Sequence, residues 1–403
     1  MFPLSEQMLN KLIALRQDIH RHPELSGVEH QTQQRLAEFF RDHGVAARAI
    51  LGTGLLVDLE GERASEIEFP GDEGVVLLRA DIDALPVQEN TGLPHASSST
   101  GVMHACGHDA HAAMLAAAIC VLHAHREAWR GRVRAIFQPA EETGTHTMTL
   151  AEEGIMDDVQ SVFALHVMPE LPLGTVGLDA GPVMAGTESF ELALTGAGGH
   201  GGNPHLGVDG IVAGAAIVQA LQGVVSREIN PVTPAVFSIG EFHAGTKMNI
   251  LASKVEMAGN TRFFSNETGD LMKEKITRIA SGLAEVYRME AEIEFKYRLG
   301  PVINDDLRTL QLRNYLEANR GGNTETSAIL PVPVHLDPLT VSEDYVRYLE
   351  HAPGMMVFLG TAAEGDPKSS KPLHDAGFYP PEEVLAYGAS LHIAAVLALA
   401  KGK

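Results

Sequence analysis

The segment MHACGHDAH, residues 103–111, holds one thiol, three imidazoles and one carboxylate within nine residues. Gly107 separates Cys106 from His108, and its small size lets the backbone bend so that both side chains can face one point. Thiolate and imidazole are ligands suited to zinc, cobalt or nickel and, less strongly, to manganese. A helix start with solvated histidines would give the same letters. The segment by itself nevertheless suggests a transition-metal site.

Two adjacent carboxylates, Glu141 and Glu142, offer the next chemistry, directly after the residues FQPA. Neighbouring side chains point in different directions, so one carboxylate can bind a metal while the other takes a proton from water. An exposed pair of acids in a turn is the alternative interpretation. His166 is expected at the end of a third apolar strand and, taken alone, is typical of a histidine packed in a core.

The elements that must position these residues are three short apolar runs that each turn polar at the carboxyl end. They span residues 75–86, 132–142 and 161–167, and an alanine-rich helical pattern at 111–125 separates the first two. This order predicts an α/β fold with a mostly parallel sheet covered by helices. In such sheets the ligand crevice lies beyond the carboxyl ends of the strands. The polar residues expected to meet there are Asp81, Asp83, Glu141, Glu142 and His166.

The pattern changes between about residues 186 and 300, where strands and helices follow the order β-α-β-β-α-β. That order is typical of a ferredoxin-like unit. We therefore predict a discontinuous α/β domain, residues 1–185 and 301–403, with a ferredoxin-like α+β domain, residues 186–300, inserted into it. The returning part of the first domain contains the run MMVFLG (355–360) and a closing helix that begins near Pro381.

The glycines of GAGGHG match the GxGxxG pattern of nucleotide-binding loops at Gly196, Gly198 and Gly201. However, Asn203-Pro204 interrupts the run before a helix begins near Asp209, so no helix N-terminus adjoins the glycines as phosphate binding requires. We expect no nucleotide site here.

Composition excludes several classes of partner. With 52 acidic and 30 basic residues among 403, the formal charge of −22 repels phosphate backbones and anionic lipid surfaces. Nucleic acid and membrane are therefore not expected as partners, although a local arginine can still hold a small carboxylate. The two cysteines are too few for a disulfide framework, the start MFPLSEQMLNKL lacks a secretory pattern, and the apolar stretches are shorter than the ~20 residues of a membrane span. We predict a cytoplasmic protein.

Motifs along nearly the whole chain resemble the two-metal aminoacylase and carboxypeptidase superfamily. The resemblance is to its amidohydrolase branch of hippurate hydrolases, auxin-conjugate hydrolases and N-acyl-amino-acid hydrolases. The motifs, in chain order, are HRHPELSGVE (20–29), RADIDALP, MHACGHDAH, FQPAEE, ALHV, GGHGGNPH (198–205), GTKMNIL (245–251), SEDY (342–345), PGMMVFLG and PLHDAGF.

The resemblance implies two divalent metal ions per chain, zinc or manganese, with cobalt or nickel as alternatives. It implies that Glu141 is the general base and acid that activates a metal-bridged water, and that Asp83 orients a ligand. The implied metal ligands are Cys106, His108, Glu142, His166 and His374.

In the inserted domain, the resemblance implies that His200 polarises the scissile carbonyl, often across a dimer interface, and that Asn249 and Arg262 hold the substrate carboxylate. A homodimer or higher homo-oligomer through this lid or dimerisation domain follows from the same resemblance. The segments HGGNPH, GNTRFF and LHDAGF depart from the usual pattern of the branch. Since all of them line the expected pocket, the sequence does not determine which acyl group and which amino acid the substrate contains.

The predicted function is hydrolysis of the amide bond of N-acyl amino acids or similar conjugates with a free carboxylate. A dipeptidase or carboxypeptidase on the same scaffold is the nearest alternative. A non-catalytic metal-dependent binding protein is another, but such a protein has no need to retain Glu141 beside an intact ligand set.

Overall fold

The computed structural model describes residues 2–63, 74–320 and 329–400. The chain divides into two compact units. Unit 1 consists of Met1–Gly181, Ile303–Asp337 and Arg347–Lys403, and unit 2 consists of Pro182–Val302 and Pro338–Val346.

Unit 1 is built on a sheet whose described strands follow the order β1-β2-β4-β3-β5-β16-β6-β15. The central strands β4, β3, β5 and β16 run parallel to one another. Strand β2 pairs antiparallel with β1 and β4, and β6 pairs antiparallel with β16 but parallel with β15. The prediction of a mostly parallel sheet is therefore confirmed. The strand bounds are β1 (Arg48–Ile50), β2 (Gly54–Glu62), β3 (Val75–Asp81), β4 (Arg130–Gln138), β5 (Val159–Pro172), β6 (Thr175–Gly177), β15 (Val332–Val334) and β16 (Gly354–Ala362).

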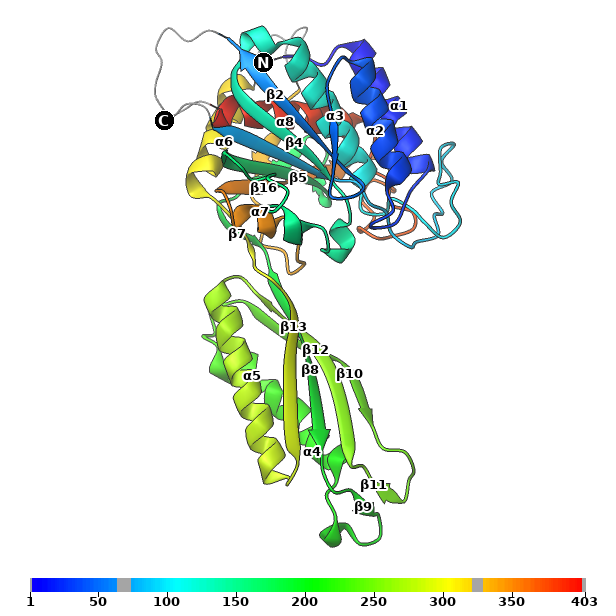
Figure 1. Cartoon of the computed structure of the whole chain (residues 1–403), viewed down its shortest axis with the longest axis vertical. Coiled ribbons are helices and arrows are strands. Elements are labelled where there is room, and N and C mark those ends of the chain that lie inside the picture. The colour runs from blue at the N-terminus through cyan, green and yellow to red at the C-terminus, as the bar shows by residue number, and fades with distance from the viewer. Residues whose placement is uncertain (1, 64–73, 321–328, 401–403) are drawn as a thin grey trace. The chain divides into compact units, whose positions relative to one another are not determined.

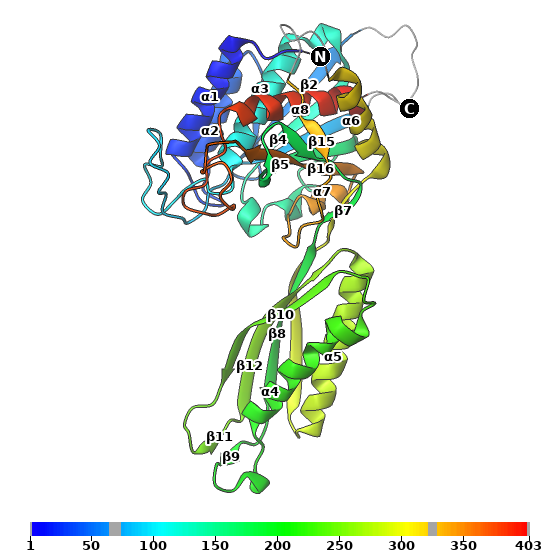
Figure 2. The same ribbon diagram turned by 180° about the vertical axis from the view of Figure 1, so that it is seen from behind.

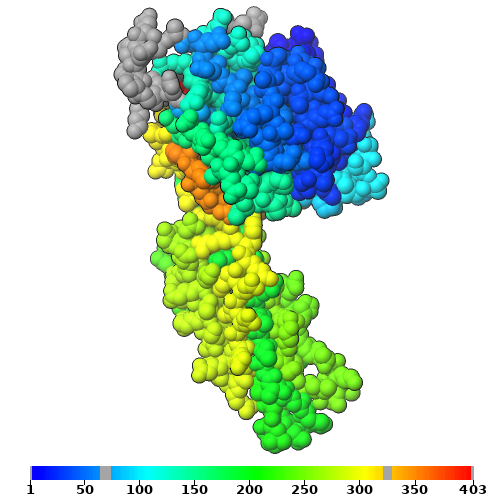
Figure 3. Space-filling view, viewed as in Figure 1, coloured from blue at the N-terminus to red at the C-terminus, as the bar shows by residue number. Residues whose placement is uncertain are grey.

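Helices α3 and α8 pack against one face of this sheet, and α1 and α2 lie outside α3 (Figure 2). Alanine fills much of α3 and α8, so the two helices approach each other and the sheet closely, and every residue of α3 from His108 to Leu122 is buried. In Figure 3 the blue surface of α1 and α2 forms one side of unit 1. The helix bounds are α1 (Glu6–Arg21), α2 (His30–Asp42), α3 (His108–Ala124), α6 (Asp306–Asn319), α7 (Val346–Leu349) and α8 (Glu383–Leu399).

Unit 2 is a four-stranded antiparallel sheet with the order β10-β12-β8-β13 and two helices, α4 and α5, on one face (Figures 1 and 2). This is the strand order of a ferredoxin-like unit. Its role as a lid or dimerisation domain stays a prediction. The bounds are β7 (Gly181–Met184), β8 (Gly186–Thr195), β9 (Gly199–His200), α4 (Gly210–Leu221), β10 (Ala235–Ala244), β11 (Ile250–Leu251), β12 (Lys254–Phe263), α5 (Asn266–Val286), β13 (Glu290–Leu299) and β14 (Val302–Asn304).

The helical stretch Gly210–Glu228 continues past α4 through a π-helical turn, Val224–Glu228. Among the described residues it is the one helix that meets the length and composition of a membrane span, with a mean hydropathy of 1.3. Part of its apolar surface is buried within unit 2, because Ala213, Ile217 and Leu221 pack into the core of this unit.

Candidate metal centre

The polar residues that follow the central strands meet at one edge of the unit 1 sheet. Asp81, the last residue of β3, is paired with Gln138, the last residue of β4. On the other side of β3, Arg79 is paired with Ala164, so Asp81 and His166 are each two residues beyond that pair. The expectation that His166 ends its strand is wrong: β5 continues to Pro172 because it goes on pairing with β16. In the register of the sheet, His166 nevertheless lies beside the carboxyl end of β3.

Three buried side chains form what we call the inner ligand group: Cys106, His108 and His166. One ligand atom from each lies within 4.8 Å of the other two. The Cys106 Sγ and His166 Nε2 atoms are 3.4 Å apart. Cys106 precedes α3, and Gly107 has a φ of 85°, a conformation that favours glycine and lets the chain turn between Cys106 and His108.

A second set, the outer ligand group, consists of Cys106, Glu142 and His374, and its ligand atoms also lie within 4.8 Å of one another. The His374 Nε2 and Glu142 Oε1 atoms are 3.6 Å apart. The backbone of His374 has a φ of 68°, and its N–H donates to the carbonyl of Ala105 at 2.8 Å. Unlike the inner group, this set includes a side chain, that of His374, which is 53% exposed. Cys106 belongs to both groups.

Hydrogen bonds to the other ring nitrogens direct two histidines toward the site. The His108 Nδ1 donates to the backbone carbonyl and the side chain of Asp83, at 3.0 and 3.2 Å. The His166 Nδ1 donates to the carbonyl of Val167 at 2.7 Å. In both rings Nε2 is then the atom with a lone pair to offer, and the buried Nε2 of His108 has no hydrogen-bond partner among the described residues. A nitrogen lone pair that makes no hydrogen bond, within a cluster of Cys, His and Glu side chains, is available to bind a metal ion.

The electrostatics of the inner ligand group differ between its members. Burial alone would lower the pKa of His108, but the charges of Asp81 and Cys106 raise it above its usual value. Burial raises the pKa of the Cys106 thiol well above its usual value, although the nearby His108 opposes the shift. A coordinated metal ion deprotonates a thiol outright, so a bound cation would offset the cost of a thiolate here. Burial, together with the charge of His111, lowers the pKa of His166 to about 3, which keeps the ring neutral as a metal ligand must be.

A buried network behind the inner ligand group was not assigned from the sequence. The Arg79 Nη1 and Asp81 Oδ2 atoms are 2.6 Å apart, and Asp81 Oδ1 accepts from His111 Nδ1 at 2.6 Å. The His111 Nε2 in turn accepts the backbone N–H of Val167 at 3.0 Å, which ties α3 to β5 beside His166. The signal was present in the sequence: a charged arginine within a buried apolar strand needs a partner.

The three predicted substrate residues belong to unit 2, and only two of them come together. His200, in β9, adjoins Asn249, whose carbonyl accepts the backbone N–H of Gly201 at 2.9 Å. The His200 Nδ1 accepts the N–H of Gly202 at 3.0 Å, so its Nε2 carries the proton of the neutral ring. Arg262 lies in β12 and donates to Ser342 Oγ at 2.9 Å.

Arg262 is at the far end of the unit 2 sheet from His200. Along β12 it is eight residues beyond Lys254, which pairs with Thr195 at the end of β8 that leads into His200. At roughly 3.3 Å per residue this is about 26 Å of strand. Within one chain the structure therefore does not bring Arg262 together with His200 and Asn249.

Comparisons with known proteins place the chain in a family. Residues 77–398 match peptidase family M20/M25/M40. The chain is 34% identical to an N-acetyl-L-cysteine deacetylase of Bacillus subtilis over 366 residues, 90% of this chain and 84% of that protein. It is 36% identical to thermostable carboxypeptidase 1 of Saccharolobus solfataricus over 385 residues, 94% of this chain and 93% of that protein.

A similar solved structure is that of a dinuclear metal-binding peptidase of the M20 family from Bacillus subtilis. It is 31% identical, with a TM-score of 0.84, over 98% of this chain and 99% of that one. The chain belongs to peptidase family M20/M25/M40. It is a hydrolase that acts on amide bonds, and its clustered ligand atoms support a site for two metal ions.

Proposed function

We propose that the protein hydrolyses the amide bond of N-acyl amino acids or similar amino-acid conjugates, releasing a carboxylic acid and an amino acid. The observation that carries this proposal is the pair of ligand groups that share Cys106, with the adjacent carboxylates of Glu141 and Glu142 beside them. The similarity to an N-acetyl-L-cysteine deacetylase supports the substrate class.

Zinc or manganese, with cobalt or nickel as alternatives, fits the donor set of thiolate, imidazole and carboxylate. Cys106, His108 and His166 would hold one ion, and Cys106, Glu142 and His374 would hold the other. When bound, two such ions polarise the scissile carbonyl and lower the pKa of water.

The protein's own groups would then move the protons. Glu141 takes a proton from the attacking water and returns it to the leaving amine, while its neighbour Glu142 stays a ligand. Asp83 couples the two sides of the site, because its carboxylate accepts from the His108 ring and, through Oδ2, from the backbone N–H of Glu142 at 3.1 Å. Although burial alone would raise the pKa of Asp83, the hydrogen bond and charge of His108 hold it below its usual value, so Asp83 stays an acceptor.

Substrate binding in this proposal needs a second copy of the chain. Arg262 would pair with the substrate carboxylate, and His200 Nε2 would donate to the carbonyl oxygen of the scissile bond. Since about 26 Å of strand separates these residues within one chain, His200 and Asn249 would come from the other copy.

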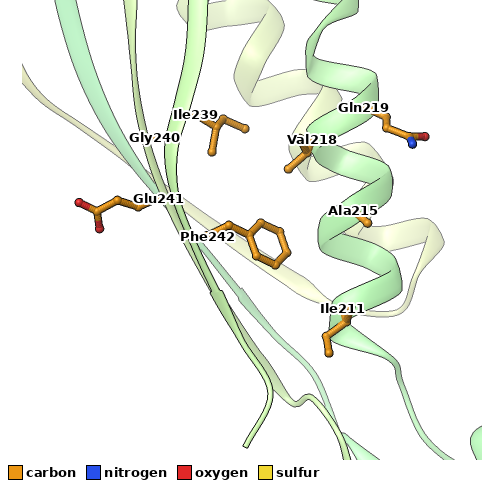
Figure 4. A pocket seen from close by; sticks show the side chains of 8 residues that line it. All are labelled: Ile211, Ala215, Val218, Gln219, Ile239, Gly240, Glu241 and Phe242. Atoms are coloured by element: carbon orange, nitrogen blue, oxygen red, sulfur yellow. The ribbon is translucent and has the colours of Figure 1, made fainter. Parts of the chain in front are cut away.

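The surface of unit 2 offers a face for such a dimer. Strand β10 is the edge of its sheet, and a groove of about 480 Å³ lies between β10 and α4 (Figure 4). Ile211, Val218, Ile239 and Phe242 line it with apolar side chains, and Ile211 and Phe242 are 48% and 39% exposed. Apolar residues beside an unpaired edge strand suit a homodimer interface.

The similarity to a thermostable carboxypeptidase favours a second candidate, the same chemistry on a peptide substrate. Acetyl, benzoyl, indole-acetyl and longer acyl amino acids, tested against dipeptides on enzyme of defined metal content, separate the two. We expect acyl amino acids to be cleaved preferentially, and their carboxamides, which lack the carboxylate, to be poor substrates. Preference for dipeptides would overturn the proposed substrate class.

The proposal places the enzyme in the cytoplasm. Cys106 and Cys120 are both buried and neither is in a disulfide, as expected for a reducing compartment.

A further inference from the structure

The segment ELSGVE, residues 24–29, connects α1 to α2 and runs along the edge of the metal centre. It belongs to the motif HRHPELSGVE, residues 20–29. None of the proposed metal ligands lies in this motif, and neither does Glu141, the proposed proton-transfer residue. The carbonyl of Glu24 accepts the backbone N–H of Ala84 at 2.8 Å, and Leu25 forms a parallel bridge with Ala84. The segment is therefore fixed to the loop that follows Asp83.

Glu29 extends from this segment into the loop that holds the carboxylate pair. Its side chain is fully buried, and its Oε1 accepts the backbone N–H of Ala140 at 2.9 Å and that of Gly27 at 2.8 Å. Its Oε2 accepts from the hydroxyl of Thr53. All three contacts are with neutral donors, so this buried carboxylate is held by hydrogen bonds.

Ala140 immediately precedes Glu141 and has a φ of 57°, a left-handed conformation that residues with a Cβ adopt rarely. A strained backbone of this kind persists only where surrounding contacts hold it. The hydrogen bond from its N–H to Glu29 is such a contact. A rotation at Ala140 would change the direction of both Glu141 and Glu142.

Ser26 makes a second contact from the same segment. Its hydroxyl donates to Asp83 Oδ2 at 2.7 Å, and the same oxygen accepts the backbone N–H of Glu142 at 3.1 Å. The other oxygen of Asp83 holds the His108 ring. Segment 24–29 thus reaches the carboxylate pair by two independent routes.

We propose that Glu29 is a positioning residue for the reaction: it holds the backbone of Ala140 and thereby sets the directions of Glu141 and Glu142, with Ser26 supporting the same loop through Asp83. The inference rests on the proposed roles of Glu141 and Glu142. Catalytic groups must be held within roughly 0.5 Å of the productive geometry, so a loop that loses its anchor loses turnover before it loses its fold.

Glu24 provides a matched control within the same segment. Its carboxylate also accepts hydrogen bonds from the backbone, but they come from the first turn of α2: Gln31 N at 3.1 Å and Thr32 N at 2.8 Å. Both glutamates hold backbone N–H groups of the fold, and only Glu29 holds the loop before Glu141.

The experiment compares Glu29→Ala, Glu29→Gln and Glu24→Ala with the wild type. For each protein we would measure kcat, KM and stability to urea, and a titration with Mn²⁺ would give the affinity for the ion of the outer ligand group. We expect Glu29→Ala to lose about 10- to 100-fold in kcat, as a displaced catalytic group does, with KM changed less than about threefold. Glu29→Gln, whose amide oxygen can still accept from Ala140, should recover most of that loss. Glu24→Ala should lose stability but keep kcat within about twofold, because the carboxylate that it removes is bonded to the first turn of α2, and the backbone contact of Glu24 with Ala84 is kept.

Unchanged kcat in Glu29→Ala, or an equal loss in Glu24→Ala, would overturn the inference. If Glu29→Ala does not fold, Ser26→Ala and Glu29→Gln make the comparison: Ser26→Ala should fall below Glu24→Ala in kcat, whereas Glu29→Gln should stay near the wild type. Should the wild type cleave none of the panel substrates, the proposed function fails. The titration then decides the positioning role separately, because Glu29→Ala should bind the ion of the outer ligand group more weakly, whereas Glu29→Gln and Glu24→Ala should bind it like the wild type.

Discussion

The two ligand groups of the metal centre share one thiol but differ in how the fold supports them. His108 and His166 of the inner group are buried, lie in α3 and β5, and have their Nδ1 atoms fixed by hydrogen bonds. The outer group takes Glu142 from a short 3-10 turn and the half-exposed His374 from a loop. A ligand fixed by regular structure loses less entropy on binding a metal than one in a loop. The inner group should therefore hold its ion more tightly.

The largest effect is expected where the two groups meet. Cys106→Ala removes a proposed ligand from both groups and should abolish activity and lower the content of both ions. Cys120→Ala, a buried cysteine on the core face of α3, should cost only stability. Metal analysis and turnover of the two variants test this. A fully metallated, active Cys106→Ala enzyme would remove the thiol from the site.

The next effect separates the adjacent glutamates. Glu141→Gln should keep its metal and fold while losing ~10²–10⁴-fold or more in kcat, because it removes the group that accepts and returns the proton. Glu142→Gln should lose metal along with activity. Turnover and metal content under identical metal supply decide the assignment. Loss of metal from Glu141→Gln, with metal retained in Glu142→Gln, would reverse it.

The comparison of the groups is tested most directly by their histidines. His374→Ala should retain about one ion per chain, since the inner group is intact, and should bind the other only weakly. His166→Ala should lose the inner ion and also lose stability, because the substitution leaves a cavity in a buried strand. Metal content after dialysis against a weak chelator measures both. If His374→Ala loses both ions as readily as His166→Ala, the two groups do not differ in affinity.

The smallest expected effect concerns the buried network that anchors α3 below the inner group. Asp109, next to His108, has its Oδ2 at 3.0 Å from Arg16 Nε and 3.1 Å from His20 Nδ1. Burial alone would lower the pKa of His20, but the charge and hydrogen bond of Asp109, aided by Glu89, raise it to about 9.

Because the folded pKa of His20 is above the unfolded value, its contribution to stability is complete below about pH 6.5 and is lost as the pH rises through about 9. At roughly 1.4 kcal/mol per pKa unit the contribution is about 3 kcal/mol. The free energy of unfolding, measured with urea, should decline in the wild type as the pH rises from 6.5 to 9. In His20→Gln this decline should be smaller. The control is His22→Gln, which removes a partly exposed neighbouring histidine and leaves the contact between His20 and Asp109 in place.

Much of the architecture follows from local patterns in the sequence. The apolar runs that became β3, β4, β5 and β16 predicted a mostly parallel sheet, because only a sheet covered on its faces buries such runs. The alternation of elements from 186 to 300 predicted the ferredoxin-like order of unit 2. The position of His166 within a longer strand was missed, because the pairing of β5 with β16 depends on residues nearly 200 positions apart.

The sequence by itself determined which residue types are available at the site and which family they resemble: Cys-Gly-His, the glutamate pair and the later histidines. Only the tertiary structure decided that Cys106 lies in both ligand groups, and that Arg262 lies at the end of the unit 2 sheet opposite to the one from which β8 leads into His200. The same holds for Glu29, which holds the backbone of a residue 111 positions away. Local patterns record whether a side chain is buried or exposed, since burial follows the period of a helix or strand. They do not record which distant atom completes a buried hydrogen bond, because that depends on how the whole chain packs.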